Sequence, residues 1–358
     1  MITSTRPGVA SCLISLACLA VAPRALTAQT DSAVFVHGAA SSGSTWNYAR
    51  NLFTTWFPSL YTAAPSLNQQ TDLFAQGAQL ATHMSSGGTT LLLSHSNGGI
   101  VSRKASSSKS ARGIVTVGTP HTGAPIANQL GAIQERLGWI ALATGDVLSL
   151  HLYNAWVNPA PLQLIQFTEQ AAYIGAGFAA GAWVTSTNFL GTWSAFDQDD
   201  VPGSAFLTSL PVGGTNRYSA SVSLSPWAAA AGPWILAFSE QDAIGLSDGL
   251  WAWGLTLYDF AYELADYIDG SWPDAAFATI AIGSALYLAW EFQNLGGTWC
   301  GYVIGGGCFF HDGFIPTSRQ TYPGGGVNTN ITNGAAHTYQ TESPTVANYL
   351  RARVEDIL

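Results

Sequence analysis

The feature that most constrains the fold of this chain is an apolar run that ends directly in a turn of small residues. Thr89–Leu93 predicts a buried strand, and the turn Ser94–Gly99 follows it without a spacer. A helix is then expected from Gly99 to about Ser106, and another strand over Gly113–Val117. A strand, a sharp turn and a helix in this order are typical of a parallel sheet with crossover helices.

The neighbouring segments continue the same alternation. Ala33–His37 predicts a buried strand, and Ser44–Phe57 and Gln69–Met84 predict helices with apolar positions at helical spacing. Ser343–Leu358 predicts a C-terminal helix. The order of these elements predicts a three-layer α/β sandwich with a mostly parallel sheet.

Composition limits the classes of partner that the chain can bind. Charged residues make up 9% of the 358 residues, and the formal net charge is −9. A nucleic-acid-binding protein needs a basic face, so no nucleic-acid partner is expected. Hydrophobic residues make up 47%, including 13 Trp, 13 Tyr and 16 Phe, which excludes intrinsic disorder and leaves apolar residues for a surface.

The N-terminal segment Met1–Ala28 has the pattern of a secretory signal peptide. Arg6 precedes the apolar stretch Val9–Ala22, and small residues flank a cleavage point near Ala28. We therefore expect a secreted, extracellular mature chain that begins after this segment.

Cys300 and Cys308 are the cysteines that remain after cleavage. In an oxidising compartment a glycine-rich hairpin between them could close as a disulfide, and two buried free thiols are the alternative. A metal site would need further ligands, and the sequence offers only His311 and Asp312 nearby, so no metal is expected.

Two apolar regions, at about residues 124–226 and 244–297, are expected to be helical, lid-like insertions in a single α/β domain of residues 29–358. Within them, residues 170–196 and 275–290 are the longest apolar stretches. The first is long enough to span a membrane, but it contains Thr, Ser and Asn and lacks a basic flank. We therefore expect insertions that cover a cleft rather than a transmembrane anchor.

Ser96 stands at the apex of the turn after the apolar strand. A nucleophilic serine at such a turn needs small residues two positions before and after it, and these are Ser94 and Gly98. Asn97, the residue after the nucleophile, would give one backbone N–H to an oxyanion hole, and Ala39 would give the other. The alternative for Ser96 is a helix-capping serine.

A serine nucleophile requires a base. His337, in a loop of small residues before the C-terminal helix, is preferred over His311 for this role. His95, next to Ser96, is expected to point away from it.

A catalytic histidine in turn requires a carboxylate that orients it. Asp312 follows the strand-like segment Tyr302–Phe310 and is the preferred acid. Asp242, which follows the predicted strand Trp234–Phe238, is the alternative.

Together these motifs resemble the α/β-hydrolases, and among them the secreted bacterial lipases and esterases. The segments that carry the resemblance are Val36-His37-Gly38-Ala39 with Trp46 beyond it, Ser94-His95-Ser96-Asn97-Gly98, Val117-Gly118-Thr119-Pro120-His121-Thr122-Gly123, Asp312-Gly313 and His337. The resemblance implies the order nucleophile, acid, base, no cofactor, and a structural rather than catalytic role for His121. Ser94 departs from the family pattern, which usually has glycine there.

The aromatic residues of the two insertions favour a hydrophobic ester, at a lipid–water or polymer interface, as the substrate of a lipase or carboxylesterase. One alternative is a depolymerase of aliphatic polyesters with the same triad. Another is a non-catalytic, membrane-associated binding protein of the same fold.

Overall fold

A computed structural model describes residues 31–39, 41–129, 199–225, 299–305, 310–332 and 335–358, and isolated positions between 251 and 297. The expected signal peptide lies outside the described residues. So do most of the two expected insertions, including residues 170–196, and the predicted strand Trp234–Phe238.

A six-stranded sheet in the order β2-β1-β3-β4-β5-β6 forms the centre of the described structure. Every neighbouring pair of strands is parallel. The strands are β1 Ser32–Val36, β2 Tyr61–Ala63, β3 Thr90–His95, β4 Gly113–Val117, β5 Arg217–Val222 and β6 Val327–Ile331.

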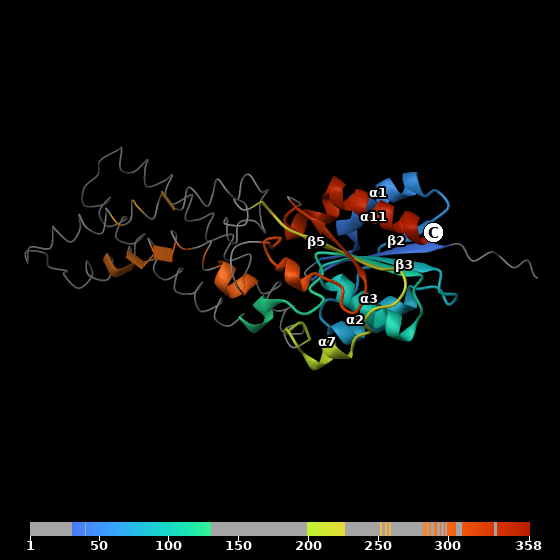
Figure 1. Cartoon of the computed structure of the whole chain (residues 1–358), viewed down its shortest axis with the longest axis horizontal. Coiled ribbons are helices and arrows are strands. Elements are labelled where there is room, and N and C mark those ends of the chain that lie inside the picture. The colour runs from blue at the N-terminus through green and yellow to red at the C-terminus, as the bar shows by residue number, and fades with distance from the viewer. Residues whose placement is uncertain are drawn as a thin grey trace, which may run out of the picture.

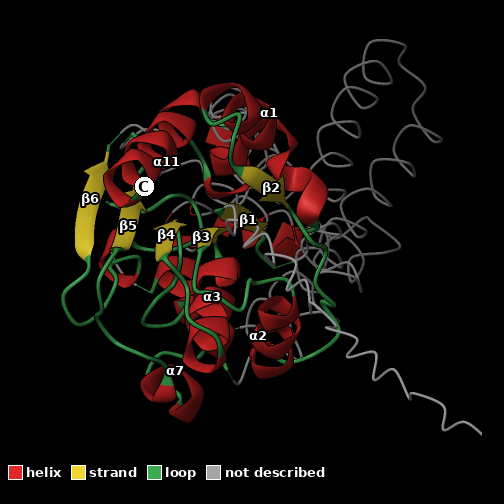
Figure 2. Ribbon diagram, turned by 90° about the vertical axis from the view of Figure 1, so that its right-hand side faces the viewer, coloured by secondary structure: helices red, strands yellow, loops and turns green. Residues whose placement is uncertain are grey.

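Helices cover both faces of the sheet, as Figures 1 and 2 show. Helices α1 (Asn47–Trp56) and α11 (Pro344–Ile357) lie on one face, and α2 (Leu73–Thr82) and α3 (Asn97–Ser108) lie on the other. The short helix α7 (Ala205–Ser209) lies below α3 in the view of Figure 1. This arrangement confirms the predicted three-layer α/β sandwich with a mostly parallel sheet.

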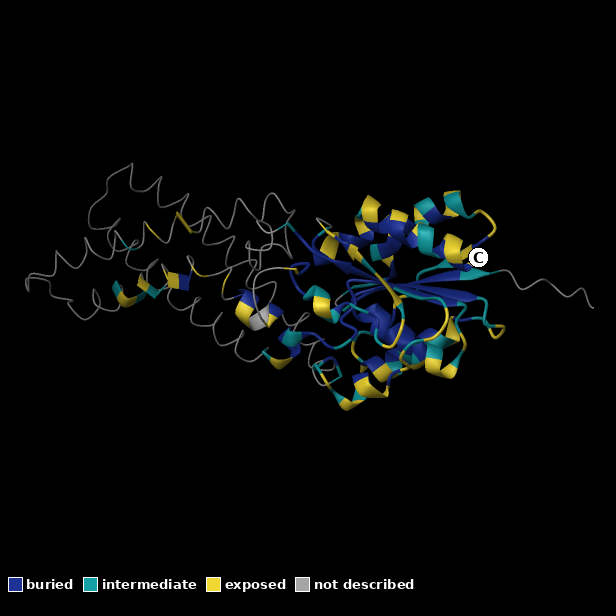
Figure 3. Ribbon diagram, in the orientation of Figure 1, coloured by how far each residue is buried: buried dark blue, intermediate teal, exposed yellow. Residues whose placement is uncertain are grey.

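The apolar run in β3 follows from its position between two helical layers. Leu91 and Leu93 pack in the core beneath α1 and α11, whereas Leu92 packs in the core beneath α2 and α3. Since side chains alternate between the faces of a strand, a strand covered on both faces has to be apolar throughout. Figure 3 shows the sheet as buried and the outward sides of the helices as exposed.

The structure corrects two expectations. The segment Tyr302–Phe310 was expected to be strand-like, but Cys300–Ile304 forms the π-helical turn η4, which ends at a left-handed Gly305 with φ of 73°. Strand β5 belongs to the central sheet although it falls within residues 124–226, the range expected for the first insertion. None of the helices within the described ranges has the length and apolarity needed to cross a membrane.

Candidate active site

Ser96 occupies a strained turn between β3 and α3. Its backbone has φ of 55° and ψ of −137°, a conformation that non-glycine residues rarely adopt. Two neighbouring glycines make room for this turn. A Cβ atom on Gly98 would lie 2.5 Å from the carbonyl oxygen of Val36, and one on Gly38 would lie 2.6 Å from Cβ of Ser96. The turn therefore holds the Ser96 hydroxyl at the carboxyl end of the parallel strands.

The departure from the family pattern at Ser94 has a structural explanation. The Ser94 side chain is fully buried, and its Oγ lies 2.7 Å from Oγ of Ser102 on α3. A buried hydroxyl is tolerated where it has a hydrogen-bond partner. The pair therefore allows a serine where glycine is usual and ties the end of β3 to the helix.

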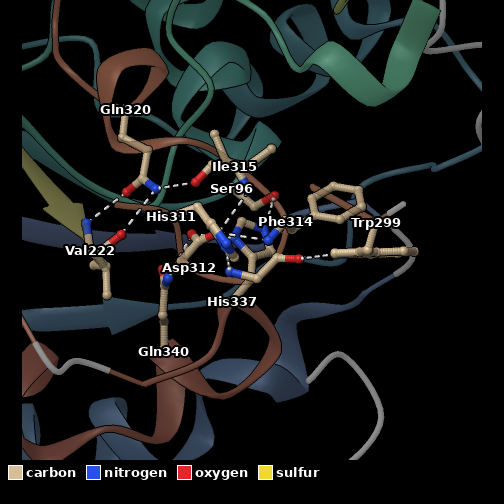
Figure 4. A network of polar contacts seen from close by, with 11 residues as sticks. Ser96, Val222, Trp299, His311, Asp312, Phe314, Ile315, Gln320, His337 and Gln340 are labelled. Carbon is tan, nitrogen blue, oxygen red and sulfur yellow. Dashed lines mark hydrogen bonds and ion pairs between the residues drawn. The ribbon is translucent and has the colours of Figure 1, made fainter. Parts of the chain in front are cut away.

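His337 connects Ser96 with Asp312, as Figure 4 shows. Its Nε2 lies 2.9 Å from Ser96 Oγ, and its Nδ1 lies 2.7 Å from Asp312 Oδ2. Because a carboxylate only accepts hydrogen bonds, Nδ1 carries the proton, and Nε2 is free to accept from the serine hydroxyl. The histidine comes from the first position of the short helix η6 (His337–Glu342), and its backbone N–H donates to the Asp312 carbonyl at 2.8 Å.

Asp312 is fully buried, and its carboxylate accepts four hydrogen bonds in the described structure. Oδ1 accepts from the backbone N–H groups of Phe314 at 3.1 Å and Ile315 at 2.8 Å. Oδ2 accepts from His337 and, at 2.8 Å, from Nε2 of Gln340. Burial acts to raise the pKa of Asp312, but His337 and these hydrogen bonds outweigh it and hold the pKa below its usual value. The site therefore keeps this carboxylate charged.

The His95 side chain packs against the ring of His337. Its ring lies 4.7 Å from the His337 ring, centre to centre, because the carboxyl end of β3 faces the loop that carries His337. Burial and, next, the charge of His337 lower the pKa of His95 to about 3. The ring is therefore a neutral packing partner of His337.

The other residues named from the sequence lie outside the described contacts between Ser96, His337 and Asp312. His311 is buried, and its Nδ1 accepts from the Gly313 N–H at 2.9 Å, so it braces the acid loop. Asp242 and Cys308 lie outside the described residues, while Cys300 is buried and disulfide-bonded. His121 is buried with Nε2 2.8 Å from Thr116 Oγ1, which fits a structural role.

The two residues expected to supply oxyanion donors, Asn97 and Ala39, lie in segments next to Ser96. Asn97 is the first residue of α3, where helical N–H groups lack partners within the helix. Ala39 follows Gly38, whose Cα carries no side chain and approaches Ser96 closely. Both amides therefore come from segments that adjoin the hydroxyl. Within the described ranges, no group of three His, Cys, Asp or Glu side chains is placed to hold a metal ion.

The sequence matches no family model and no curated protein. Among solved structures, the mature form of Bacillus licheniformis lipase BlEst2 matches with 14% identity and a TM-score of 0.39, covering 92% of each chain. Cfl2 from Burkholderia cenocepacia matches with 13% identity and a TM-score of 0.38, covering 92% of this chain and 88% of that one.

Shorter matches include an extracellular α/β-hydrolase from a Paenibacillus species, with 17% identity and a TM-score of 0.23, covering 28% of this chain. This alignment spans 46% of the Paenibacillus chain. A separate match to the propeptide form of BlEst2 covers 31% of this chain and 28% of that one. The fold assignment itself rests on the strand order and on the strained turn at Ser96.

Proposed function

We propose that the chain is a serine hydrolase of carboxylic esters that works through an acyl-enzyme on Ser96. The observation that carries this proposal is the unbroken hydrogen-bond chain from Ser96 Oγ through His337 to Asp312, with distances of 2.9 and 2.7 Å. The strained backbone at Ser96 supports it, because strain of this kind concentrates at functional sites.

In the acylation step, Ser96 Oγ attacks the carbonyl carbon of the ester while its proton passes to His337 Nε2. The carbonyl oxygen becomes an oxyanion, which the backbone N–H groups of Asn97 and Ala39 stabilise, each by about 3 kcal/mol. Asp312 stabilises the imidazolium. The tetrahedral intermediate then expels the alkoxide, which leaves as an alcohol with the proton from Nε2.

Deacylation repeats these steps with water. His337 Nε2 takes a proton from the water as its oxygen attacks the acyl carbon. Collapse of the second tetrahedral intermediate breaks the bond to Ser96 Oγ, and the serine regains its proton from His337. The products are a carboxylic acid and an alcohol, and no cofactor takes part.

The proposed substrates are hydrophobic esters. Phe310, two positions before Asp312, is 73% exposed, and Trp251 and Trp290 are 52% and 47% exposed. Large apolar side chains at the surface favour apolar ligands through burial of their area. As part of this proposal, the enzyme is secreted after cleavage near Ala28, and Cys300 pairs with Cys308.

A fluorophosphonate probe tests the central claim. We expect the wild type to be labelled and Ser96→Ala to remain unlabelled, because the probe reacts only with an activated serine. Ser107→Ala, at an exposed position on α3, is the control and should label like the wild type. A folded wild-type protein without labelling would contradict the proposal and favour a binding protein of the same fold.

The substrate class requires a second experiment. We expect hydrolysis rates of p-nitrophenyl esters to rise from acetyl to medium and long acyl chains, and emulsified triglyceride to be hydrolysed. Hydrolysis of an aliphatic polyester film without activity on triglyceride would favour the depolymerase alternative instead.

A further inference from the structure

Gln320 is fully buried, and its side-chain amide makes three hydrogen bonds in the described structure, all to backbone groups. Oε1 accepts from Val222 N–H at 2.7 Å, while Nε2 donates to the Val222 carbonyl at 3.2 Å and to the Ile315 carbonyl at 2.8 Å. Figure 4 shows these three contacts. Val222 is the last residue of β5, and Ile315 lies three residues after Asp312. The amide therefore joins a strand of the sheet to the loop of the proposed catalytic acid.

On the side of the sheet, the Gln320 amide binds backbone groups beyond the end of a neighbouring strand. β4 ends at Val117, which pairs with Ala220, two residues before Val222. Gly118 N–H, just after β4, donates to the Ala220 carbonyl at 3.2 Å. Buried backbone N–H and C=O groups cost free energy when they lack a partner. The amide thus serves as the partner of Val222 where β4 no longer reaches.

On the side of the loop, Ile315 connects the Gln320 amide with Asp312. Ile315 N–H donates to Asp312 Oδ1 at 2.8 Å, and the Ile315 carbonyl, which Gln320 binds, also accepts from Asp312 N–H at 3.3 Å. The loop also runs beside the chain that follows β5, since Leu224 N–H donates to the His311 carbonyl at 2.8 Å. A displacement of Ile315 would therefore change both the backbone of Asp312 and one donor to its carboxylate.

We infer that Gln320 is a positioning residue for Asp312, which acts through Ile315 and fixes the carboxylate relative to the sheet that carries Ser96. Gln320 differs in this from Gln340, which donates to the carboxylate directly. The proposed reaction needs Oδ2 within hydrogen-bond distance of His337, and small displacements of catalytic groups are costly. The expected effect on turnover rests on the proposed function.

A double-mutant cycle tests whether Gln320 acts through Asp312. Gln320→Met has a similar side-chain length and removes all three hydrogen bonds. We expect it to lower kcat for p-nitrophenyl esters about tenfold at unchanged KM, because the placement of the acid matters in the transition state and not in substrate binding. In the Asp312→Asn background the same change should alter the residual kcat less than about twofold, since the carboxylate is already gone.

Gln76→Met is the matched control for this cycle. Gln76 is a buried glutamine on α2 whose Nε2 donates to the Thr71 carbonyl at 2.9 Å, so its replacement should lower Tm without changing kcat. If Gln320→Met leaves kcat unchanged, or lowers it by the same factor in both backgrounds, the inference is overturned. If circular dichroism shows that Gln320→Met does not fold, Gln320→Asn takes its place under the same criteria, because its shorter side chain cannot span Val222 and Ile315.

The proton on His337 Nδ1 gives a measurement that needs no turnover. It lies in a hydrogen bond of 2.7 Å to a charged carboxylate, so we expect a low-field signal in the proton NMR spectrum. The signal should move upfield in Gln320→Met and stay in place in Gln76→Met, and an unchanged signal in a folded Gln320→Met would contradict the inference. If the wild type neither hydrolyses esters nor reacts with the fluorophosphonate, the proposed function fails, while this signal still decides whether Gln320 positions Asp312.

Discussion

Asp312 and Asp200 are both almost completely buried, but their surroundings are opposite. Asp312 accepts four hydrogen bonds, and its pKa is lowered. Neither carboxyl oxygen of Asp200 has a hydrogen-bond partner in the described structure, and burial raises the pKa of this group. Burial acts in the same direction on both carboxyl groups, so their neighbours decide whether each is charged.

The charge of Asp312 matches what the proposed reaction needs. A positive charge develops on His337, so a permanent negative charge on Asp312 stabilises the transition state. The surroundings of Asp312 therefore keep a negative charge where the proposed reaction needs one.

The largest effect is expected from Asp312→Asn. The asparagine cannot hold His337 in the tautomer that accepts the serine proton, and in other Ser-His-Asp enzymes such a change lowers kcat about 10⁴-fold. We expect a loss of that size in p-nitrophenyl ester hydrolysis, with a circular dichroism spectrum like that of the wild type.

Asp242→Asn is the matched control for that experiment. Since Asp312 already occupies Nδ1 of His337, we expect Asp242→Asn to keep most of its activity. A large loss of kcat in Asp242→Asn together with an active Asp312→Asn would reverse the assignment of the acid.

Gln340→Leu is expected to have a smaller effect. It removes one of the four donors to Asp312, and a hydrogen bond to a charged group contributes about 1.5–3 kcal/mol. We expect kcat to fall about tenfold at unchanged KM. Gln76→Leu is the control. This buried glutamine on α2 donates to the Thr71 carbonyl at 2.9 Å, so its replacement should change Tm but not kcat. Equal losses of kcat in both variants would show a general effect on folding.

The sequence predicts the elements whose signal is local. The structure confirms the apolar run of β3, the turn at Ser96 and the helix after it. The run is visible in the sequence because a strand covered on both faces is apolar throughout. β2 and β6 were not predicted, because β2 has three partly exposed residues and β6 is a polar edge strand with the sequence Val-Asn-Thr-Asn-Ile. Neither has the apolar pattern by which strands are recognised.

The side chains around the site also divide into those that the sequence predicts and those that it does not. Ser96, His337 and Asp312 were nominated by chemical type and chain order, and the structure places them in hydrogen-bond contact. Gln340 was missed, because its significance depends on which polar groups approach it after folding. The spacing of Gln340, three residues after His337 at the start of η6, was the one available signal.

His95 offers a finer test of how His337 is held. Since its pKa is about 3, the ring is neutral at the pH of assay, and Phe can replace it as a packing partner. We expect His95→Phe to leave the pH–rate profile unchanged between about pH 5 and 9, and His95→Ala to lower kcat about fivefold through loss of the ring contact. A shifted profile in His95→Phe would show that His95 titrates during the reaction.

The smallest expected effect is thermal, and it completes the comparison of the two aspartates. Because the folded pKa of Asp312 is lowered, its stabilisation is present above the unfolded pKa of about 3.9 and is lost as pH falls through the folded pKa. Asp312→Asn should therefore have a Tm about 2–5 °C below the wild type at pH 7, and this difference should shrink below about pH 4. Because burial raises the pKa of Asp200, Asp200→Asn should have a higher Tm than the wild type at pH 7, which is the opposite sign. If both variants shift Tm in the same direction at pH 7, burial alone governs the two carboxyl groups, and the contrast between their surroundings has no energetic consequence.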